Sequence, residues 1–263
     1  MAKKKYKIGL ALSGGGARGF AHIGVLRALH EMGIYPEAVA GTSAGSIVGS
    51  LYAAGLRPDE MESFVSSASL IRAIKPGLSP RGLISLSYLK THLEKHLPFR
   101  RIETLPRKLF IAVCNLNTGD LELLEKGSIA EAVMASSSIP LVFLPVDIDG
   151  NQYVDGGLLM NLPAAPLREI CDHVISVNLI PKSPLPPNKL TGVLSAATIA
   201  NRVFYLSVIA NSAPAEQISD IVISPLALDD FHIFQFNKMQ DLMDIGYQAT
   251  QAQKEKILQT VRG

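Results

Sequence analysis

The motif Gly41-Thr42-Ser43-Ala44-Gly45 contains the serine best suited to chemistry. It lies between a short apolar run, residues 38–41, and a helical pattern rich in small residues, 44–54. A G-x-S-x-G sequence between a strand and a helix is typical of a nucleophile elbow, whose sharp turn exposes the serine hydroxyl at a sheet edge. A serine that only caps a helix would also fit the five residues. The surrounding elements favour Ser43 as a nucleophile.

A second glycine motif precedes it. Gly14, Gly16 and Gly19 spell G-x-G-x-x-G after an apolar run, as in a dinucleotide-binding turn. Such a turn requires an acidic residue about 20 positions later, at the end of the next strand, where this chain has the serine motif instead. No Gly-Lys-Ser/Thr follows the glycines, so the phosphate-binding P-loop pattern is also missing. We therefore predict no nucleotide cofactor.

The same glycines suit a transient anion. If the strands before the two motifs are parallel neighbours, both loops open at one edge of the sheet. We expect the amides of Gly14, Gly15 and Gly16 to converge above Ser43 and to stabilise the oxyanion of an acyl-transfer intermediate. One such donor typically lowers the barrier by ~2.7–4 kcal/mol. Arg18 either braces this loop or attracts an anionic head group, and both interpretations stay open.

A serine nucleophile needs a base, and the histidines are poorly placed to supply one. His92 and His96 have an i, i+4 spacing that can bind a metal, but without an acidic partner it indicates a solvated helix face. His232, in the late loop DDFHIF, has a position suited to a triad, with no local support. The others lie in helical or strand patterns: His22, His30 and His173. We predict no metal site.

Asp155 is the preferred base. It ends a predicted strand, residues 152–155, whose partner strand joins it through a tight turn at Asp149-Gly150, and it precedes Gly156-Gly157. An unperturbed aspartate, with a pKa near 3.9, accepts a serine proton poorly. We expect burial beside the glycine loops to raise the pKa of Asp155.

Apolar, β-branched runs alternate with helical patterns along the chain, which indicates an α/β fold: a three-layer α/β/α sandwich with a mostly parallel central sheet. There is no internal repeat, and the Pro-rich residues 181–188 are a loop rather than a boundary. We predict one domain over residues 1–263. The expected helices are residues 20–31, 44–54, 58–68, 87–96, 129–136, 164–170, 194–211 and 238–261.

Composition excludes several classes of protein. Of the 263 residues 48% are apolar and 18% charged, and the net charge is +2, so neither disorder nor a nucleic-acid surface is expected. The apolar run at residues 8–12 is too short for a secretory signal. Residues 192–210 are long enough to span a membrane, but Asn201 and Arg202 near their middle favour an amphipathic helix.

The two cysteines, Cys114 and Cys171, form no metal spacing or disulfide framework. These features predict a cytoplasmic protein. The basic start, Lys3-Lys4-Lys5, is a solvated terminus or a contact with an anionic membrane. A peripheral contact with the inner membrane surface therefore stays open, and the oligomeric state is not predicted.

Three motifs in one order resemble the patatin-like phospholipases: GGGARG at 14–19, GTSAG at 41–45 and DGG at 155–157. ASSSIPLVFLPV at 135–146 and NLP at 161–163 extend the resemblance. The chain is similar to short, single-domain bacterial members, related to the catalytic domain of the neuropathy-target esterases. It departs from plant patatins at Ser13, where they carry aspartate.

The resemblance implies hydrolysis of lipid acyl esters, in a phospholipid or lysophospholipid, without metal or cofactor. It implies a Ser43–Asp155 dyad, with the oxyanion bound by the amides of Gly14, Gly15 and Gly16. The rest of the motifs support that site: Arg18, Gly19, Gly41, Gly45, Gly156 and Gly157.

Two interpretations remain open. A catalytically silent lipid-binding or scaffolding protein on the same fold would carry the same motifs, and reaction with a fluorophosphonate probe separates it from an enzyme. Residues 69–86 combine apolar and basic side chains with Pro-Gly and Pro-Arg-Gly hinges, so they either control substrate access or form an ordinary surface loop.

Overall fold

The computed structural model describes residues 4–66, 86–180 and 196–262. Within these ranges one eight-stranded sheet runs in the order β5-β6-β3-β2-β1-β7-β8, with β4 paired to β3 outside that path. The strands are β1 (Tyr6–Leu12), β2 (Ala38–Thr42), β3 (Lys108–Asn115), β4 (Leu121–Leu124), β5 (Val146–Ile148), β6 (Asn151–Asp155), β7 (Cys171–Val177) and β8 (Ile221–Ile223).

The predicted α/β class is confirmed, with a mixed sheet. The strands β3, β2, β1, β7 and β8 are parallel, whereas β6 and β4 run antiparallel to β3, and β5 runs antiparallel to β6. The predicted hairpin joins β5 to β6 through Asp149 and Gly150, both with positive φ, as a tight two-residue turn requires. The antiparallel strands therefore gather at one edge of the sheet.

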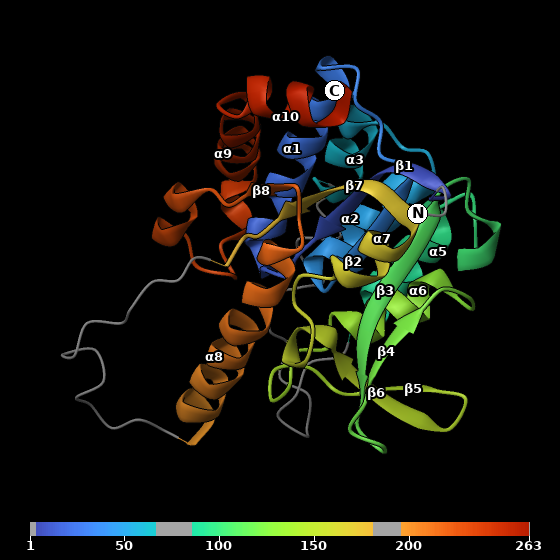
Figure 1. The fold of residues 1–263 in the computed structure, drawn as a ribbon. Coiled ribbons are helices and arrows are strands. Elements are labelled where there is room, and N and C mark those ends of the chain that lie inside the picture. Colours follow the sequence, from blue (N-terminus) through green and yellow to red (C-terminus); the bar gives the residue numbers. More distant parts are fainter. Residues whose placement is uncertain (1–3, 67–85, 181–195, 263) are drawn as a thin grey trace.

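Helices surround the sheet (Figure 1). They are α1 (Phe20–Glu31), α2 (Ala44–Ala53), α3 (Pro58–Val65), α5 (Ser87–His96), α6 (Ile129–Ser136), α7 (Ala165–Ile170), α8 (Ala196–Gln217), α9 (Met239–Gln251) and α10 (Lys254–Arg262). The predicted helix over residues 238–261 is divided into α9 and α10, and Gln253 at the break donates from its side chain to the Val222 carbonyl of β8. The helix expected to end at residue 211 continues to Gln217, past Pro214.

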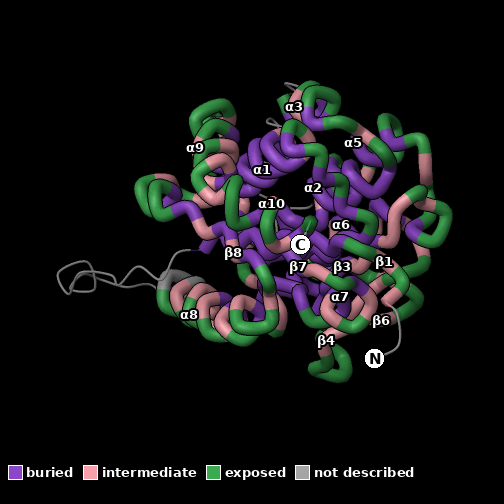
Figure 2. The backbone as a smooth tube through the Cα atoms, turned by 45° about the horizontal axis from the view of Figure 1, so that its top comes forward, coloured by how far each residue is buried: buried purple, intermediate pink, exposed green. Residues whose placement is uncertain are grey.

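The two faces of the sheet are packed differently. Leu10 and Leu12 of β1 point into the main core, which is filled by side chains of α1, α2, α9 and their neighbours. Ala11 points to the opposite face, where a smaller cluster includes Leu167 of α7 and Ala215 of α8. Figure 2 shows the strands with α1 and α2 as the buried centre and α8 at the periphery. Successive side chains of β1 thus contribute to clusters on opposite faces of the sheet, and the cluster that contains Leu10 and Leu12 is the larger.

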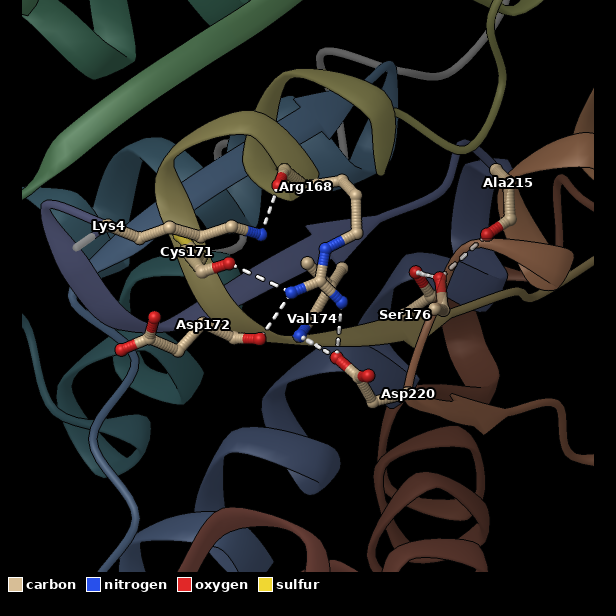
Figure 3. A network of polar contacts seen from close by, with 9 residues as sticks. Lys4, Arg168, Cys171, Asp172, Val174, Ser176, Ala215 and Asp220 are labelled. Atoms are coloured by element: carbon tan, nitrogen blue, oxygen red, sulfur yellow. Dashed lines mark hydrogen bonds and ion pairs between the residues drawn. The ribbon is translucent and has the colours of Figure 1, made fainter. Parts of the chain in front are cut away.

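Polar contacts of Arg168 hold the amino end of the sheet together (Figure 3). Its guanidinium pairs with Asp220 at 2.7 Å and donates to the Cys171 carbonyl at 2.9 Å. The same Asp220 carboxylate accepts the Val174 amide at 2.7 Å. The contacts join α7, β7 and the segment before β8, at the end of the parallel strands opposite to Ser43.

Candidate active site

Ser43 stands between β2 and α2 in a strained conformation. Its φ of 52° and ψ of −123° are those of the first central residue of a type II′ turn, which costs a non-glycine residue about 1–3 kcal/mol. A Cβ on Gly41 would meet the backbone of Gly45, and a Cβ on Gly45 would meet the Leu12 carbonyl. Strand and helix thus approach closely enough to require glycine on both sides of the serine, as the motif predicts.

A buried serine, Ser136, bridges this turn to the neighbouring strand β3 by two hydrogen bonds. The Ser43 amide donates to Ser136 Oγ at 2.9 Å, and Ser136 Oγ donates to the Ala112 carbonyl of β3 at 2.7 Å. Ser136, at the end of α6, has no solvent exposure. The strained turn is therefore anchored to the neighbouring strand.

Asp155 ends β6 and is only 2% exposed. Its carboxylate accepts a hydrogen bond from the Gly157 amide at 2.8 Å, and the Ser43 hydroxyl lies close enough to act as a second donor that lowers its pKa. Burial raises the pKa of Asp155 to about 7, against the lowering effect of these two hydrogen bonds. Gly156 fits because its Cα lies against the Ala112 carbonyl, where a Cβ would collide. The predicted nucleophile and base are therefore in direct contact.

The glycine loop lies beside Ser43 but differs from expectation at Gly14. The Gly14 amide donates to the Asn161 carbonyl at 3.2 Å, so it is already committed to a backbone acceptor. A Cβ on Gly14 would lie 3.1 Å from Ser43 Cβ, which shows how closely the loop approaches the serine. Within the described residues, the amides of Gly15 and Gly16 donate to no acceptor.

Arg18 braces the loop. Its guanidinium donates to the Phe231 carbonyl from Nε at 2.9 Å and from Nη2 at 2.7 Å, and to the Leu179 carbonyl from Nη1 at 3.3 Å. It is only 7% exposed, so this conformation favours bracing over head-group attraction. Gly19 follows where a Cβ would lie 2.6 Å from that of Ala44, so the loop packs directly on the serine turn.

A small apolar pocket of about 60 Å³ opens beside Ser43. Its walls include Ile47 of α2, Leu89 of α5, Phe143 and Phe234. The pocket is thus a narrow apolar entrance in this conformation.

The histidines take other positions. The His232 side chain is exposed, while its neighbour Ile233 lines the pocket. His92 is buried against Phe64, with ring centroids 4.6 Å apart, so the solvated face expected for the His92–His96 pair is wrong at His92. His92 lies on the core side of α5 with Leu89 and Leu93, whereas His96 is exposed.

Three residues with contacts to the site have no role assigned by the motifs. Ser136 anchors the serine turn, Asn161 binds the Gly14 amide, and buried His22 contacts the Ser13 carbonyl. Ser136 and Asn161 fall inside ASSSIP and NLP, whereas His22 has only its proximity to the glycine motif as a signal.

Residues 69–85 of the segment expected to control access lie outside the described residues, and Leu86 lines the pocket. Among the described residues no group of three or more His, Cys, Asp or Glu side chains gathers to hold a metal ion. Over the same ranges, every helix is too short or too polar to cross a bilayer.

Comparison with known proteins identifies related sequences. A family model described as patatin-like phospholipase matches residues 10–168. An NTE family protein of Mycobacterium tuberculosis is 35% identical over 177 residues, which cover 66% of this chain and 49% of that protein. The lysophospholipase NTE1 of Candida albicans is 31% identical over 185 residues, which cover 65% of this chain and 13% of that protein. The chain thus spans about half the length of the mycobacterial relative.

Among solved structures, human GIVD cytosolic phospholipase A2, in complex with a methyl γ-linolenyl fluorophosphonate inhibitor and terbium chloride, has a similar fold. The TM-score is 0.50 with 11% sequence identity, over 98% of this chain and 59% of that one. At this identity the likeness concerns the fold alone.

Proposed function

The chain belongs to the patatin-like phospholipase family, and from that premise we propose that it is a serine acyl hydrolase acting on lipid esters through Ser43 and Asp155. The observation that carries the proposal is the position of Ser43, in a strained backbone turn, beside the buried carboxyl of Asp155, whose pKa it lowers. A base with a pKa of about 7 is well matched to proton transfer near neutral pH. The substrate class is a phospholipid or lysophospholipid.

In the first half of the reaction, Asp155 accepts the Ser43 proton as Oγ attacks the ester carbonyl carbon. The tetrahedral intermediate then collapses by breaking the ester C–O bond, and Asp155 returns the proton to the departing alcohol oxygen. In the second half, Asp155 accepts a proton from a water that attacks the acyl-enzyme. The free acid leaves and the proton returns to Ser43, so the dyad is regenerated.

The oxyanion is stabilised by the amides of Gly15 and Gly16, which have no acceptor in the described structure. Gly14 is left out of this proposal because its amide binds Asn161. The N-terminus of α2 begins at Ala44, directly after the serine, and adds positive potential at the same point. These donors are fixed before the reaction begins, which is the main source of their effect.

The apolar pocket supports an acyl chain as the recognised part of the substrate. Its lining adds Ile139 and Phe236 to the walls already described, so a hydrocarbon chain would be desolvated beside Ser43. The name of one similar protein, the lysophospholipase NTE1 of Candida albicans, supports a lipid ester over a small soluble ester.

We further infer that the substrate is met at a lipid surface, which α8 contacts. Ile199, Val203 and Leu206 of α8 are exposed at i, i+4 and i+7, so they share one face of the helix. Exposed Leu159, from the turn after Asp155, and exposed Phe234, from the pocket wall, add apolar area near the site. Figure 1 shows α8 extending away from the body of the fold.

A lipid-ester panel compares wild-type protein with Ser43→Ala and Asp155→Asn, and fluorophosphonate labelling is located by peptide mass spectrometry. We expect ester hydrolysis in the wild type, attachment of the probe at Ser43, and loss of turnover in both variants, because a two-residue unit fails when either member is removed. His232→Ala is the matched control and should keep its activity.

Loss of activity in His232→Ala with turnover retained in Asp155→Asn would overturn the dyad. Lipid binding by a wild-type protein that neither hydrolyses esters nor takes up the probe would instead identify a silent lipid-binding protein.

A further inference from the structure

His22 is a buried polar residue that the proposed mechanism leaves unused. It lies in the first turn of α1 with no solvent exposure. Its Nε2 lies 2.8 Å from the Ser13 carbonyl oxygen. Because a carbonyl only accepts hydrogen bonds, Nε2 carries the proton and donates. Its Nδ1 is buried with no hydrogen-bond partner in the described structure.

This hydrogen bond acts on the first peptide unit of the glycine loop. The Ser13 carbonyl and the Gly14 amide belong to one planar unit and point in opposite directions. His22 holds the carbonyl side of that unit, and the Asn161 carbonyl accepts the amide side at 3.2 Å. The plane is therefore fixed from both sides.

The next two peptide units are held by their carbonyls alone. The Gly14 carbonyl accepts Ser13 Oγ at 3.0 Å, and the Gly15 carbonyl accepts the Arg18 amide at 3.2 Å. The N–H groups of these two peptide units, which point away from the carbonyls, are the amides of Gly15 and Gly16. Because the Gly14 and Gly15 carbonyls are hydrogen-bonded within the protein, the Gly15 and Gly16 amides remain available to an oxyanion. The orientation of the first peptide unit determines the orientation of the two that follow it.

We propose that His22 is a positioning residue for the oxyanion loop: its hydrogen bond to the Ser13 carbonyl orients the peptide units that present the Gly15 and Gly16 amides. The inference rests on the proposed function, since it assigns a role within the same reaction. His22 does not touch the substrate or Ser43. It acts through the loop.

Two properties of the site support this role over simple space filling. A leucine would fill the core without leaving a buried ring nitrogen unpaired, which is costly. The hydrogen bond also does not change with pH while Asp155 titrates, because burial lowers the pKa of His22 to about 4. The imidazole therefore stays a neutral Nε2 donor while Asp155 ionises.

The test compares His22→Leu and His22→Gln with wild type on a soluble short-chain ester. The leucine removes the donor, whereas the glutamine amide restores an N–H near the position of Nε2. His30→Leu is the matched control, since His30 lies on the same helix against Tyr35 and Tyr52 and also has a buried nitrogen without a partner in the described residues.

We expect His22→Leu to lower kcat by at least about tenfold, toward the 10²–10³-fold loss seen when one oxyanion donor is removed. KM should stay within about twofold, because oxyanion donors act in the transition state. The rate of fluorophosphonate labelling should fall in parallel, and His22→Gln should recover most of both rates. A His22→Leu variant with kcat within about twofold of wild type, or equal losses in His30→Leu, would overturn the proposal.

A structural measurement separates this inference from the proposed function. In amide nuclear magnetic resonance spectra, His22→Leu should shift the Gly15 and Gly16 signals, and His22→Gln should return them toward the wild-type positions. Unchanged signals in His22→Leu would refute the positioning role, even if the wild-type protein hydrolysed no ester. If His22→Leu does not fold, the glutamine variant decides alone: kcat and glycine signals near those of wild type are required.

Discussion

Ser43 directly follows β2, and Asp155 is the last residue of β6; these two strands lie on opposite sides of the same strand, β3. Thr42, next to Ser43, pairs with Ala112, whereas Asp155 pairs with the following residue, Val113. Because β6 runs antiparallel to β3, its last residue comes level with the last residue of parallel β2. The two side chains thus meet across β3, and their contact depends on the register of a mixed sheet.

The buried carboxyl predicts the pH dependence of turnover. Asp155 acts as a base only when it is ionised, and burial raises its pKa to about 7. We therefore expect kcat/KM to increase with pH through about 7 and then to level off, reporting the free protein. Steady-state rates on a soluble ester from pH 5 to 9 measure this profile. A rate already level at pH 5 would mean a base with an ordinary carboxyl pKa.

The same shift predicts how Asp155→Asn changes stability. The folded-state pKa is raised, so the contribution of Asp155 to the free energy of unfolding is fully present below the unfolded pKa near 3.8 and is lost as pH rises to about 7. Asn does not ionise and avoids this loss, which is on the order of 4 kcal/mol at most. Relative to wild type, the variant should gain stability between pH 4 and 7 in urea unfolding. A relative loss over that interval would contradict the burial argument.

Ser136→Ala should weaken both the fold and the reaction. The change leaves the Ser43 amide and the Ala112 carbonyl without their shared partner, and such buried groups cost about 1–3 kcal/mol. It also releases the anchor of the strained serine turn, so kcat should fall. Denaturant unfolding and esterase assays measure the two effects.

Ser137→Ala is the matched stability control for that variant. Ser137 is the next residue and is buried, but its hydroxyl has no hydrogen-bond partner within the described residues. Its removal should not lower the free energy of unfolding, because a buried hydroxyl without a partner itself costs about 1–3 kcal/mol. Equal losses in both variants would show that the Ser136 bridge is not what stabilises the turn.

Sequence patterns predicted those features of the fold and site that depend on residues close together in the chain. Residues 41–45 required an elbow because two backbones approach there, and both flanking glycines have no space for a Cβ. The helices α1, α5 and α6 have the predicted bounds, because the periodic apolar residues that indicate each helix lie within that helix. Asp155 was recognisable at a strand end before two glycines.

The remaining features depend on contacts between distant segments. The Gly14 amide was expected to face Ser43, but the Asn161 carbonyl accepts it. Arg18 was left with two interpretations because its acceptors, Leu179 and Phe231, lie far along the chain. Hydrogen-bond partners of this kind follow from tertiary packing, which the periodicity of a single segment does not specify.

A charge on the exposed face of α8 tests the inferred lipid contact. Val203 is 60% exposed, and placing an aspartate there removes apolar area and adds repulsion at an anionic surface, worth about 1 kcal/mol for a single charge. With the lost burial of a valine, about 1.5 kcal/mol or more, Val203→Asp should weaken binding to phosphatidylserine-containing vesicles by at least about tenfold. Vesicle flotation and hydrolysis of vesicle lipid measure the loss, while hydrolysis of a soluble ester should stay unchanged.

Leu116→Asp is the control for that variant, because Leu116 is 47% exposed and lies after β3 rather than on α8. It adds the same charge and should leave vesicle binding within about twofold of wild type. An equal fall with both variants would indicate a nonspecific charge effect. A fall in soluble-ester activity of Val203→Asp would indicate damage transmitted through Asn211, which donates from the same helix to the Gly157 carbonyl behind Asp155. A change in oligomeric state on size-exclusion chromatography would instead assign the exposed face to a second copy of the chain.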